Sequence, residues 1–278
     1  MIALRDLSDV DSCRDVVRLQ EAVWGREGDI VPASLLVASA RRGGMLIGAF
    51  DADRLIGFVW SVPGVREGML TQWSHMLAVL PEVRSSGVGQ ALKSAQRDRA
   101  LSAGVDLIEW TFDPLQAPNA HLNIARLGCV VTTYLVDAYG AMSGPLHRGT
   151  PTDRLIAEWH LRAPHVERRL ARSRGLASGP IVRSAEVLDA PLVLAAVPGG
   201  GRSRPGPFRG DVEARRVLVQ IPADFIELQR TSTELALEWR LAVRQAFLAL
   251  FARGYRVVDF WAGEGGTYLV EKTVDASR

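Results

Sequence analysis

The sequence has few cysteines, little net charge and no long apolar run, and each shortage excludes a class of protein. The two cysteines, Cys13 and Cys129, form no C-x-x-C pair, so neither a disulfide framework nor a zinc site is expected. No apolar run approaches the roughly 20 residues that a membrane span needs. The N-terminus, MIALRDLSDVDS, carries acidic residues and lacks a signal-peptide core. These shortages favour a cytoplasmic protein without a membrane partner.

The charge balance gives no electrostatic reason to expect nucleic acid as a partner. Lys and Arg number 33 against 31 Asp and Glu, for a net charge of +2. The low-complexity stretch 198–207 holds arginines but no interleaved aromatic residues, so it is interpreted as a mobile loop. No His, Cys, Asp and Glu cluster has metal-ligand spacing, and no metal is expected. With 278 residues, 47% of them hydrophobic, the chain is globular and long enough for two domains.

The most informative stretch of the chain is 75–104, which is predicted to run from a strand through a glycine turn into a helix. The apolar run 76–80 ends at Pro81, as a buried strand would. Apolar residues then recur with helical spacing from Val88 to Ala95, and Gly104 stands where a left-handed helix cap is expected. The turn between them reads Arg-Ser-Ser-Gly-Val-Gly over 84–89.

This turn has the chemistry of an anion site. The first N–H groups of a helix lack intrahelical partners and carry the positive end of its dipole. Glycine at 87 and 89 leaves those groups accessible, while Arg84 and the hydroxyls of Ser85 and Ser86 add donors. The pattern therefore predicts a pyrophosphate site, with an ordinary strand-to-helix loop as the alternative. It is neither a Rossmann fingerprint, because position 92 is Leu, nor a P-loop, because no Gly-Lys-Ser/Thr follows.

Two blocks of sequence resemble the GNAT acetyltransferases. The string V-L-P-E-V-R-S-S-G-V-G-Q-A-L at 79–92 is similar to that family's acetyl-CoA motif, Arg/Gln-x-x-Gly-x-Gly/Ala at a strand-to-helix junction. The block from Trp110 to Gly128, W-T-F-D-P-L followed by N-A-x-L-N-I-A-x-L-G, is similar to a bacterial branch of the family. The resemblance covers roughly 1–160 and implies acetyl-CoA as co-substrate and an amine of a small molecule or peptide as acceptor.

The resemblance also implies where the cofactor would bind. In the family the pantetheine amides pair with a splayed central strand, and the pyrophosphate lies on the glycine turn. The cofactor-binding residues expected on this basis are Leu77, Ala78, Val79, Arg84, Ser85, Ser86, Gly87, Val88, Gly89, Gln90, Asn119 and Asn123. Homodimerisation is implied by the resemblance alone.

The fold class expected is α/β (α+β): a GNAT-like mixed, splayed β-sheet flanked by helices, plus a smaller C-terminal α/β domain. The domain boundaries are predicted at 1–161 and 162–278, with a flexible loop at 198–210. The long helix 233–253 is apolar on two faces and is expected to be largely buried. The predicted order of strand, helix and strand over 218–261 is similar to that over 77–110. This similarity suggests a degenerate GNAT-like half, and an unrelated β-α-β unit is the alternative.

Three residues are candidate general bases for removing a proton from an acceptor amine. His75 starts the apolar part of the central strand and titrates near neutral pH. Glu109 and Asp113 lie on or beside the neighbouring strand, 107–112. Each has a structural alternative. His75 can be a structural strand histidine, and Glu109 alternates with Trp110, so only one of those two faces the cleft. Asp113 precedes Pro114 and can simply end the strand.

The usual acid of the family is missing. The resemblance places a tyrosine four residues before Gly128, where this chain has Ile124. Tyr134 and Tyr139 are the nearest substitutes, although ordinary half-buried tyrosines are the alternative for both. A non-catalytic acyl-CoA-binding module is therefore the second functional hypothesis beside an N-acetyltransferase.

The acceptor would lie against the first two helices, 13–24 and 32–42, if the resemblance holds. Trp24 and Glu21 are the expected substrate-binding residues, with Asp29 beside them. Their alternatives are a packed aromatic side chain and solvated acids. The acceptor itself is not specified by any motif.

Overall fold

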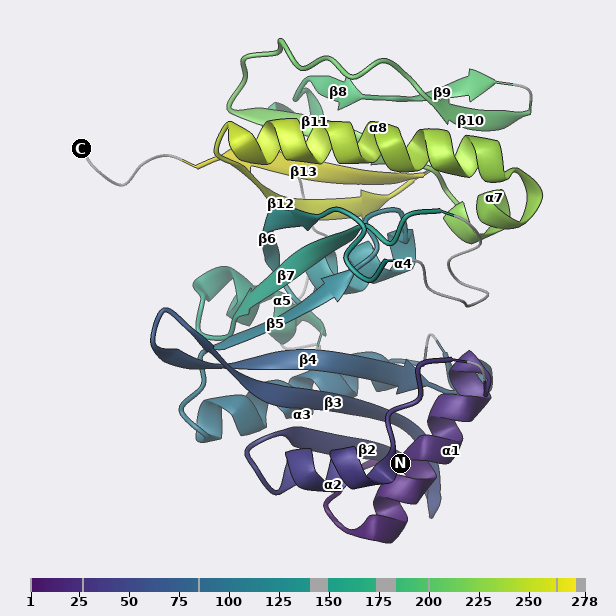
Figure 1. Cartoon of the computed structure of the whole chain (residues 1–278). Helices are drawn as coiled ribbons and strands as arrows, with labels where there is room; N and C mark the ends of the chain where they lie inside the picture. The colour runs from purple at the N-terminus through teal and green to yellow at the C-terminus, as the bar shows by residue number, and fades with distance from the viewer. Residues whose placement is uncertain are drawn as a thin grey trace. The chain divides into compact units, whose positions relative to one another are not determined.

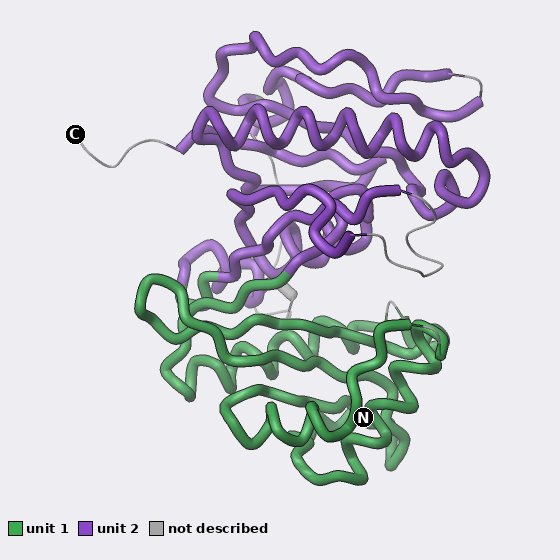
Figure 2. Tube along the Cα trace, viewed as in Figure 1, with its two compact units in different colours: residues 1–110, 160–162 green, residues 111–159, 163–278 purple. Residues whose placement is uncertain are grey.

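The structure, a computed structural model, describes residues 2–26, 28–84, 86–140, 150–173, 184–199, 201–263 and 265–273. It contains two compact units (Figure 2). Unit 1 comprises Met1–Trp110 with His160–Arg162, and unit 2 comprises Thr111–Trp159 with Ala163–Arg278. The compact units divide between residues 110 and 111. This division does not test the predicted domain boundary at residue 161, which stays a prediction.

Unit 1 is built on an antiparallel meander that ends in a parallel step (Figure 1). Its strands β1 to β4 lie side by side in sequence order and are Ala3–Asp6, Met45–Asp51, Arg54–Arg66 and Met69–Val79. Strand β5 (Leu107–Phe112) starts in this unit and runs parallel to β4. A parallel neighbour requires a crossover, which α3 (Val88–Ser102) provides. The apolar runs 45–50 and 55–62, with the polar turn 51–54 between them, predict a hairpin, and β2 and β3 form it.

The helices of unit 1 cover both faces of this sheet, with α1 (Val10–Trp24) and α2 (Ala33–Ala40) on one face and α3 on the other (Figure 1). Helix α1 begins three residues earlier than predicted, because the Asp9 side chain caps it by accepting a hydrogen bond from the Ser12 N–H at 2.9 Å. Gly25, with φ of 82°, ends it. A short 3-10 turn, η1 (Pro81–Val83), follows β4.

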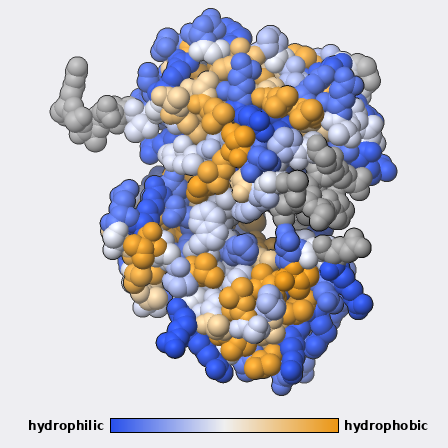
Figure 3. Space-filling view, viewed as in Figure 1, coloured by the Kyte–Doolittle hydropathy of each residue, from blue (hydrophilic) through white to orange (hydrophobic). Residues whose placement is uncertain are grey.

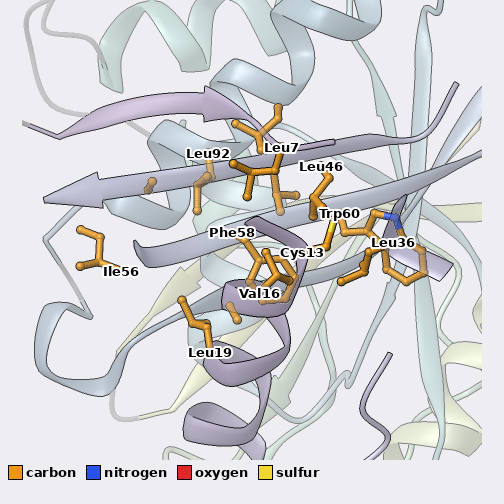
Figure 4. Packing of buried hydrophobic residues seen from close by; sticks show 14 of the residues in the cluster. Leu7, Cys13, Val16, Leu19, Leu36, Leu46, Ile56, Phe58, Trp60 and Leu92 are labelled. Atoms are coloured by element: carbon orange, nitrogen blue, oxygen red, sulfur yellow. The ribbon is translucent and has the colours of Figure 1, made fainter. Parts of the chain in front are cut away.

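The core of unit 1 lies between the sheet and its helices (Figure 4). Val16 of α1, Leu36 of α2 and Phe58 of β3 are fully buried there. One buried polar side chain ties the helical pair together: Gln20 accepts from the Val31 N–H at 2.8 Å and donates to the Val31 carbonyl at 3.1 Å. This pair of bonds satisfies both the oxygen and the nitrogen of the buried Gln20 amide, so Val31 is fixed to α1.

The strands of unit 2 pair with one another in both parallel and antiparallel orientation. In spatial order they are β7, β6, β12, β13, β11 and β8, namely Arg154–His160, Val130–Leu135, Tyr255–Ala262, Gly266–Lys272, Arg216–Ile221 and Leu192–Leu194. The last residue of β7, His160, belongs to unit 1. Strand β12 joins the C-terminal strands to β6 through antiparallel pairing at Val257↔Val131. The predicted mixed α/β fold is thus confirmed in both units.

The helices of unit 2 are short apart from one. They are α4 (Ala117–Ala120), the π-helical turn η2 (His121–Arg126), α5 (Pro164–Ser173), α6 (Ala185–Leu188), α7 (Phe225–Thr231) and α8 (Thr233–Ala252). Helix α8 carries its buried face, with Trp239 and Val243, against the sheet. No helix in the described parts of the chain combines the length and apolarity that crossing a bilayer requires.

The expectation that α8 is buried on both apolar faces is wrong. Leu237, Leu241 and Leu248 are 38%, 47% and 41% exposed. Hydrophobic and hydrophilic residues are interspersed over the surface where α8 lies (Figure 3). The sheet covers only one side of the helix, so the second row of leucines stays in contact with solvent.

The expectation of an irregular loop over 198–210 is also wrong for its first half. Strands β9 (Ala196–Gly199) and β10 (Arg202–Pro205) form an antiparallel hairpin. Gly201, with φ of 80°, supplies the left-handed turn residue that lets the chain reverse. The two prolines are tolerated because this sheet has only two strands, so each strand has one edge where no N–H is needed.

The hypothesis of a degenerate internal repeat fails on strand order. In unit 1, β4 and β5 pair directly and in parallel. In unit 2, β13 lies between β11 and β12 and is antiparallel to both. The similar strand, helix and strand patterns therefore build different sheets.

Candidate functional site

The candidate anion site is the junction between β4 and α3. Gly87 is the N-cap residue of α3, with φ of 88°, and no side chain among the described residues caps the helix. The first intrahelical bond runs from the Ala91 N–H to the Gly87 carbonyl at 2.9 Å. The N–H groups of the first turn therefore precede the hydrogen-bonded part of the helix, as an anion site requires.

The two glycines of this junction have different physical roles. A Cβ at Gly87 would meet nothing within 4 Å, so its glycine is required by the positive φ and not by crowding. A Cβ at Gly89 would meet the side chains of Val79 and Leu77 at 3.8 and 3.9 Å, which is ordinary contact. Protein packing alone therefore does not demand glycine at 89, and the space beside the first turn can accept a ligand atom.

The polar residues of the turn are only partly oriented for a ligand. Arg84 is exposed and its Nε donates to the Val79 carbonyl at 3.4 Å. The Ser86 hydroxyl donates to the Val83 carbonyl at 2.7 Å, so it stabilises the turn. Ser85 lies outside the described residues. Val88 is buried, while Gln90 is half-buried on the first turn.

Strand β4 carries an irregularity at His75. Trp60 of β3 pairs with Met76, but the next residue, Ser61, pairs with Ser74. His75 is therefore an extra residue opposite this step, which is the arrangement of a β-bulge. The bulge also changes which residues of β4 face α3. Before the bulge, the even-numbered Ser74 contacts Lys93 of α3; after it, the odd-numbered Leu77 and Val79 lie beside Gly89.

The His75 ring lies on the opposite face, towards α1 and α2. It makes an edge-on contact with Trp60, with ring centroids 5.2 Å apart. The Trp60 indole N–H donates to the Ser39 hydroxyl of α2 at 3.0 Å, which fixes its orientation. Partial burial of the imidazole lowers the pKa of His75 below its ordinary value. The histidine is thus neutral at pH 7 and able to accept a proton, while its outer side stays exposed.

The pairing of β4 with β5 is brief. Its register covers Gln72↔Ile108 and Trp73↔Glu109. Beyond the bulge, Leu77, Ala78 and Val79 pair with β3 on their other side. The backbone of these residues is thus anchored at one edge, as the proposed pantetheine contact would need.

The second candidate base, Glu109, shares a face with His75 but forms an ion pair. Its register partner Trp73 lies opposite to the α3 face, and cross-strand partners point to the same side. The Glu109 carboxylate accepts from Arg66 at 2.7 Å and is 13% exposed. Trp110 points to α3, where the Lys93 ammonium lies 3.5 Å from its ring centroid. Of the two alternating residues, Glu109 is therefore the one on the His75 side.

The third candidate base, Asp113, belongs to unit 2 and is fully engaged. Both of its oxygens accept from Arg240, at 2.7 and 2.6 Å, and one also accepts from the Leu115 N–H at 2.9 Å. A carboxylate held in this way is a structural ion pair, so Asp113 as a base stays a prediction without geometric support.

The expected acceptor residues lie at the end of α1. The Trp24 ring makes an edge-on contact with Phe58, 6.3 Å between centroids, and is half-buried. Glu21 is half-buried and lies 3.8 Å from Arg26. Asp29 is exposed. Trp24 is therefore both a core contact and a partly accessible aromatic surface, as its two interpretations require.

The expected cofactor residues of the second block lie in unit 2. The sequence predicts a short helix over 119–127 with Asn119 as its N-cap, and this is wrong, because Asn119 is exposed and sits inside α4, whose N-cap is Gln116. The helix starts earlier because Pro118 is tolerated in a first turn. Asn123 is 4% exposed, and its carbonyl accepts from the Cys129 N–H at 2.9 Å. Ile124 is fully buried.

The substitute tyrosines differ in environment. Tyr134 is buried and its hydroxyl donates to Asp153 at 2.7 Å. Burial and the neighbouring Asp153 carboxylate raise the pKa of Tyr134 far above its ordinary value. Tyr139 is 45% exposed, and its hydroxyl lies 2.6 Å from that of Thr111. Of the two side chains, Tyr139 is the exposed one.

The sequence analysis missed Trp60 and the arginines of α8. Trp60 gave no signal beyond its place in an apolar strand. Arg240 and Arg244 stand four residues apart on an otherwise apolar helix, which places them on one face and signals buried ionic partners. Those partners are Asp113 and Asp153. No group of three or more potential metal-ligating side chains occurs among the residues that the structure covers.

Comparison with known proteins gives structural neighbours only. No family model matches the sequence, and no curated protein matches it. Three solved structures illustrate the matches, all acetyltransferases or their complexes. The ribosomal-protein-S18-alanine N-acetyltransferase from Escherichia coli is 14% identical, with a TM-score of 0.47, over 59% of this chain and 96% of its own.

The other two neighbours are similarly distant. An acetyltransferase of the GNAT family from Streptococcus pneumoniae is 12% identical, with a TM-score of 0.47, over 57% of this chain and 98% of its own. Naa50 from Arabidopsis thaliana, in complex with the bisubstrate analogue CoA-Ac-MVNAL, is 16% identical, with a TM-score of 0.45, over 56% and 97%. Each match spans nearly all of the neighbour but little more than half of this chain.

Proposed function

We propose that this chain is a GNAT-superfamily N-acetyltransferase, which moves an acetyl group from acetyl-CoA to an amine of a small molecule or peptide. The observation that carries the proposal is the β4–α3 junction. An uncapped helix start, a left-handed Gly87 and space beside Gly89 coincide there with the motif Arg84-x-x-Gly-x-Gly.

The residues of this junction fit the group that the proposal requires. The N–H groups of the first turn of α3 would hold the pyrophosphate, and Arg84 would neutralise part of its charge. A Cβ at 89 would lie at ordinary contact distance from Val79 and Leu77, so a larger side chain there would extend into the proposed phosphate site. When bound, acetyl-CoA supplies an activated thioester.

His75 is the general base in this proposal. Its lowered pKa keeps the imidazole neutral, and a neutral ring nitrogen can take the proton that an attacking amine loses. The contact with Trp60, itself held by Ser39, fixes the ring. Glu109 lies on the same face and would stabilise the charged imidazolium, although Arg66 already shares its charge.

A second function is favoured by one observation. Ile124 occupies the position where the resembling family carries a tyrosine, and it is fully buried. A chain that binds acyl-CoA without turnover would serve as a sensor or an interaction module. The two functions share the β4–α3 junction and differ only in chemistry.

One experiment separates these functions. The full chain is titrated with acetyl-CoA by calorimetry and then assayed for release of free CoA thiol against a panel of small amines and short peptides. Amine-dependent thiol release supports the enzyme, while binding without release supports the module.

Gly89→Glu tests the placement of the site. The added carboxylate would fill the cradle and repel the pyrophosphate, so affinity for CoA should fall at least tenfold. Ser102→Glu is the matched control, because it adds the same side chain at the exposed far end of α3. Unchanged affinity in Gly89→Glu would contradict the proposed site.

A further inference from the structure

The strongest cluster of charged groups that acetyl transfer does not use lies inside unit 2. Three arginines meet two buried aspartates: Arg240 pairs with Asp113, and Arg244 pairs with Asp153 at 2.8 Å for each of two bonds. The third arginine, Arg154 of β7, lies 3.9 Å from an Asp113 oxygen that Arg240 already holds. Arg240 and Arg244 make the close bonds to the two carboxylates, and Arg154 makes only the longer contact to Asp113.

The remaining donors of the cluster belong to Arg154. Its Nη1 donates to the Asp153 carbonyl at 3.0 Å. Within the described residues, its Nε and Nη2 groups make no hydrogen bond, although the side chain is only 13% exposed. A guanidinium has five N–H donors in a planar fork, and two of them on one edge match the two oxygens of a carboxylate.

The arginines differ in how well they are neutralised. Burial alone would lower all three pKa values. The pairing with Asp113 outweighs burial for Arg240, and the hydrogen bonds that Arg244 donates to Asp153 outweigh it for Arg244, so both pKa values rise. For Arg154 burial dominates, and its pKa is lowered. Arg154 is thus the arginine of the cluster that makes no hydrogen bond to a carboxylate among the described residues. The Arg240 Nε is a further buried donor without a partner among the described residues.

The approach to Arg154 is framed by Tyr139 and Thr111. The Arg154 guanidinium lies 5.3 Å from the centroid of the Tyr139 ring. The Tyr139 hydroxyl lies 2.6 Å from that of Thr111, and its N–H donates to the Thr152 hydroxyl at 3.0 Å. Tyr139 is therefore an exposed ring held in place over a buried cation, with a hydroxyl pair beside it that can donate one more hydrogen bond.

We propose that Arg154, Tyr139 and Thr111 form a recognition site for the carboxylate of a small organic acid. A guanidinium edge whose donors make no hydrogen bond among the described residues suits a monoanion with two oxygens. A phosphate dianion is disfavoured, because Asp113 and Asp153 already lie within the cluster and the exposed carboxylate of Asp137, bonded to Thr152, adds a third negative charge at its edge. The flat face of Tyr139 favours an acid whose carboxylate is attached to an apolar or aromatic group. The site does not depend on acetyl transfer, since it can be tested without CoA.

The test uses benzoate as the probe, with benzamide as its neutral isostere. Both are titrated into the full chain, and binding is followed by calorimetry and by the NMR signals of the arginine Nε–Hε groups. Benzoate is expected to shift one arginine signal, which Arg154→Lys removes from the spectrum, while benzamide shifts none. Equal binding of both compounds, or no binding of benzoate, would overturn the proposal.

Variants locate the site. Arg154→Gln should lower benzoate affinity at least tenfold, and Arg154→Lys should lower it less because the charge remains while the fork is lost. Arg215→Gln is the matched control, since Arg215 is an exposed arginine of the same unit paired with Glu271, and its affinity should not change. Undiminished affinity in Arg154→Gln refutes the site, and stronger binding of inorganic phosphate than of benzoate refutes the ligand class.

A folding defect would not leave the proposal untested. If circular dichroism shows that Arg154→Gln is unfolded, Tyr139→Ala decides, because it removes an exposed ring and keeps the arginine. Its benzoate affinity should fall at least threefold, and an unchanged value would overturn the proposal.

Discussion

The imidazole of His75 and the indole of Trp60 meet edge-on, with ring planes 80° apart, at the point where β4 carries one residue more than β3. A bulge leaves a residue out of regular pairing and turns its side chain to a new direction. Here it turns a titratable group towards α1 and α2, where the proposed acceptor would bind.

The first prediction concerns the pH dependence of acetyl transfer. His75 has a lowered pKa, so it is neutral at pH 7 and becomes protonated only as the pH falls. The kcat/KM should therefore be constant near neutral pH and decline on the acid side, below the ordinary histidine pKa. His75→Gln should lower the rate by about 10²-fold and remove this acid limb.

Substitution of Trp60 tests the cause of that shift. Trp60→Ala admits water to the ring, so the pKa of His75 should rise and the acid limb should move to higher pH. Trp60→Phe keeps an apolar wall and serves as the control. An acid limb that stays in place in both variants would mean that another group titrates.

The second prediction contrasts the two glycines of the β4–α3 junction. Gly87→Ala forces a Cβ into a left-handed conformation and should reduce the free energy of unfolding by about 1–2 kcal/mol. Gly89→Ala places a methyl group at ordinary contact distance inside a helix and should stabilise the chain by roughly 0.5–1 kcal/mol. Urea denaturation followed by circular dichroism measures both. Equal effects would show that the turn geometry does not govern stability here.

The third prediction concerns the buried pair of Asp113 and Arg240, whose side chains are 14% and 1% exposed. Removing one member leaves the other charge buried without its partner. Asp113→Asn and Arg240→Met should therefore each lower the free energy of unfolding by about 3–5 kcal/mol. Replacing both should cost less than the sum of the two. Chemical denaturation of the four proteins in a double-mutant cycle gives the coupling, and additive losses would contradict a direct pair.

The fourth prediction concerns acid stability. Burial raises the pKa of Asp153, but hydrogen bonds from Arg244, the Asp137 N–H and Tyr134 outweigh it, so the net pKa is lowered. A lowered carboxyl pKa contributes stability above its unfolded value, and that stability is lost as the pH falls through the folded value. Arg244→Gln should therefore destabilise the chain at pH 7 and flatten its loss of stability in acid. Thermal unfolding scans across the acid range measure this slope, with Arg215→Gln as the control.

Much of the fold was predictable because its elements are locally encoded. Strand β5 has the predicted bounds, 107–112, and α8 ends one residue before the predicted end at 253. Helix capping explains part of the difference at α1, because the hydrogen bond from the Ser12 N–H to Asp9 starts this helix at Val10 and not at the predicted residue 13. The glycine turn between β4 and α3 was predictable too, because its conformation is set within a short segment.

The features that escaped prediction depend on residues far apart in the sequence. Asp113 was interpreted as a base because its partner, Arg240, lies 127 positions away. The bulge at His75 requires the register of β3 against β4, which an apolar run does not specify. The exposure of Leu237 and Leu241 depends on how much of α8 the sheet covers. Long-range pairing, not local propensity, decides each of these.

The ladder between β6 and β12 limits how this chain can be shortened or recombined. A fragment that stopped at residue 161 would lose β12, and Asp113 and Asp153 would lose both guanidinium partners on α8. Its open strand edge would invite other chains to add to it, so the fragment should polymerise. A chimera that contains the first 161 residues must therefore also contain α8 and β12, and these segments should be retained or removed together.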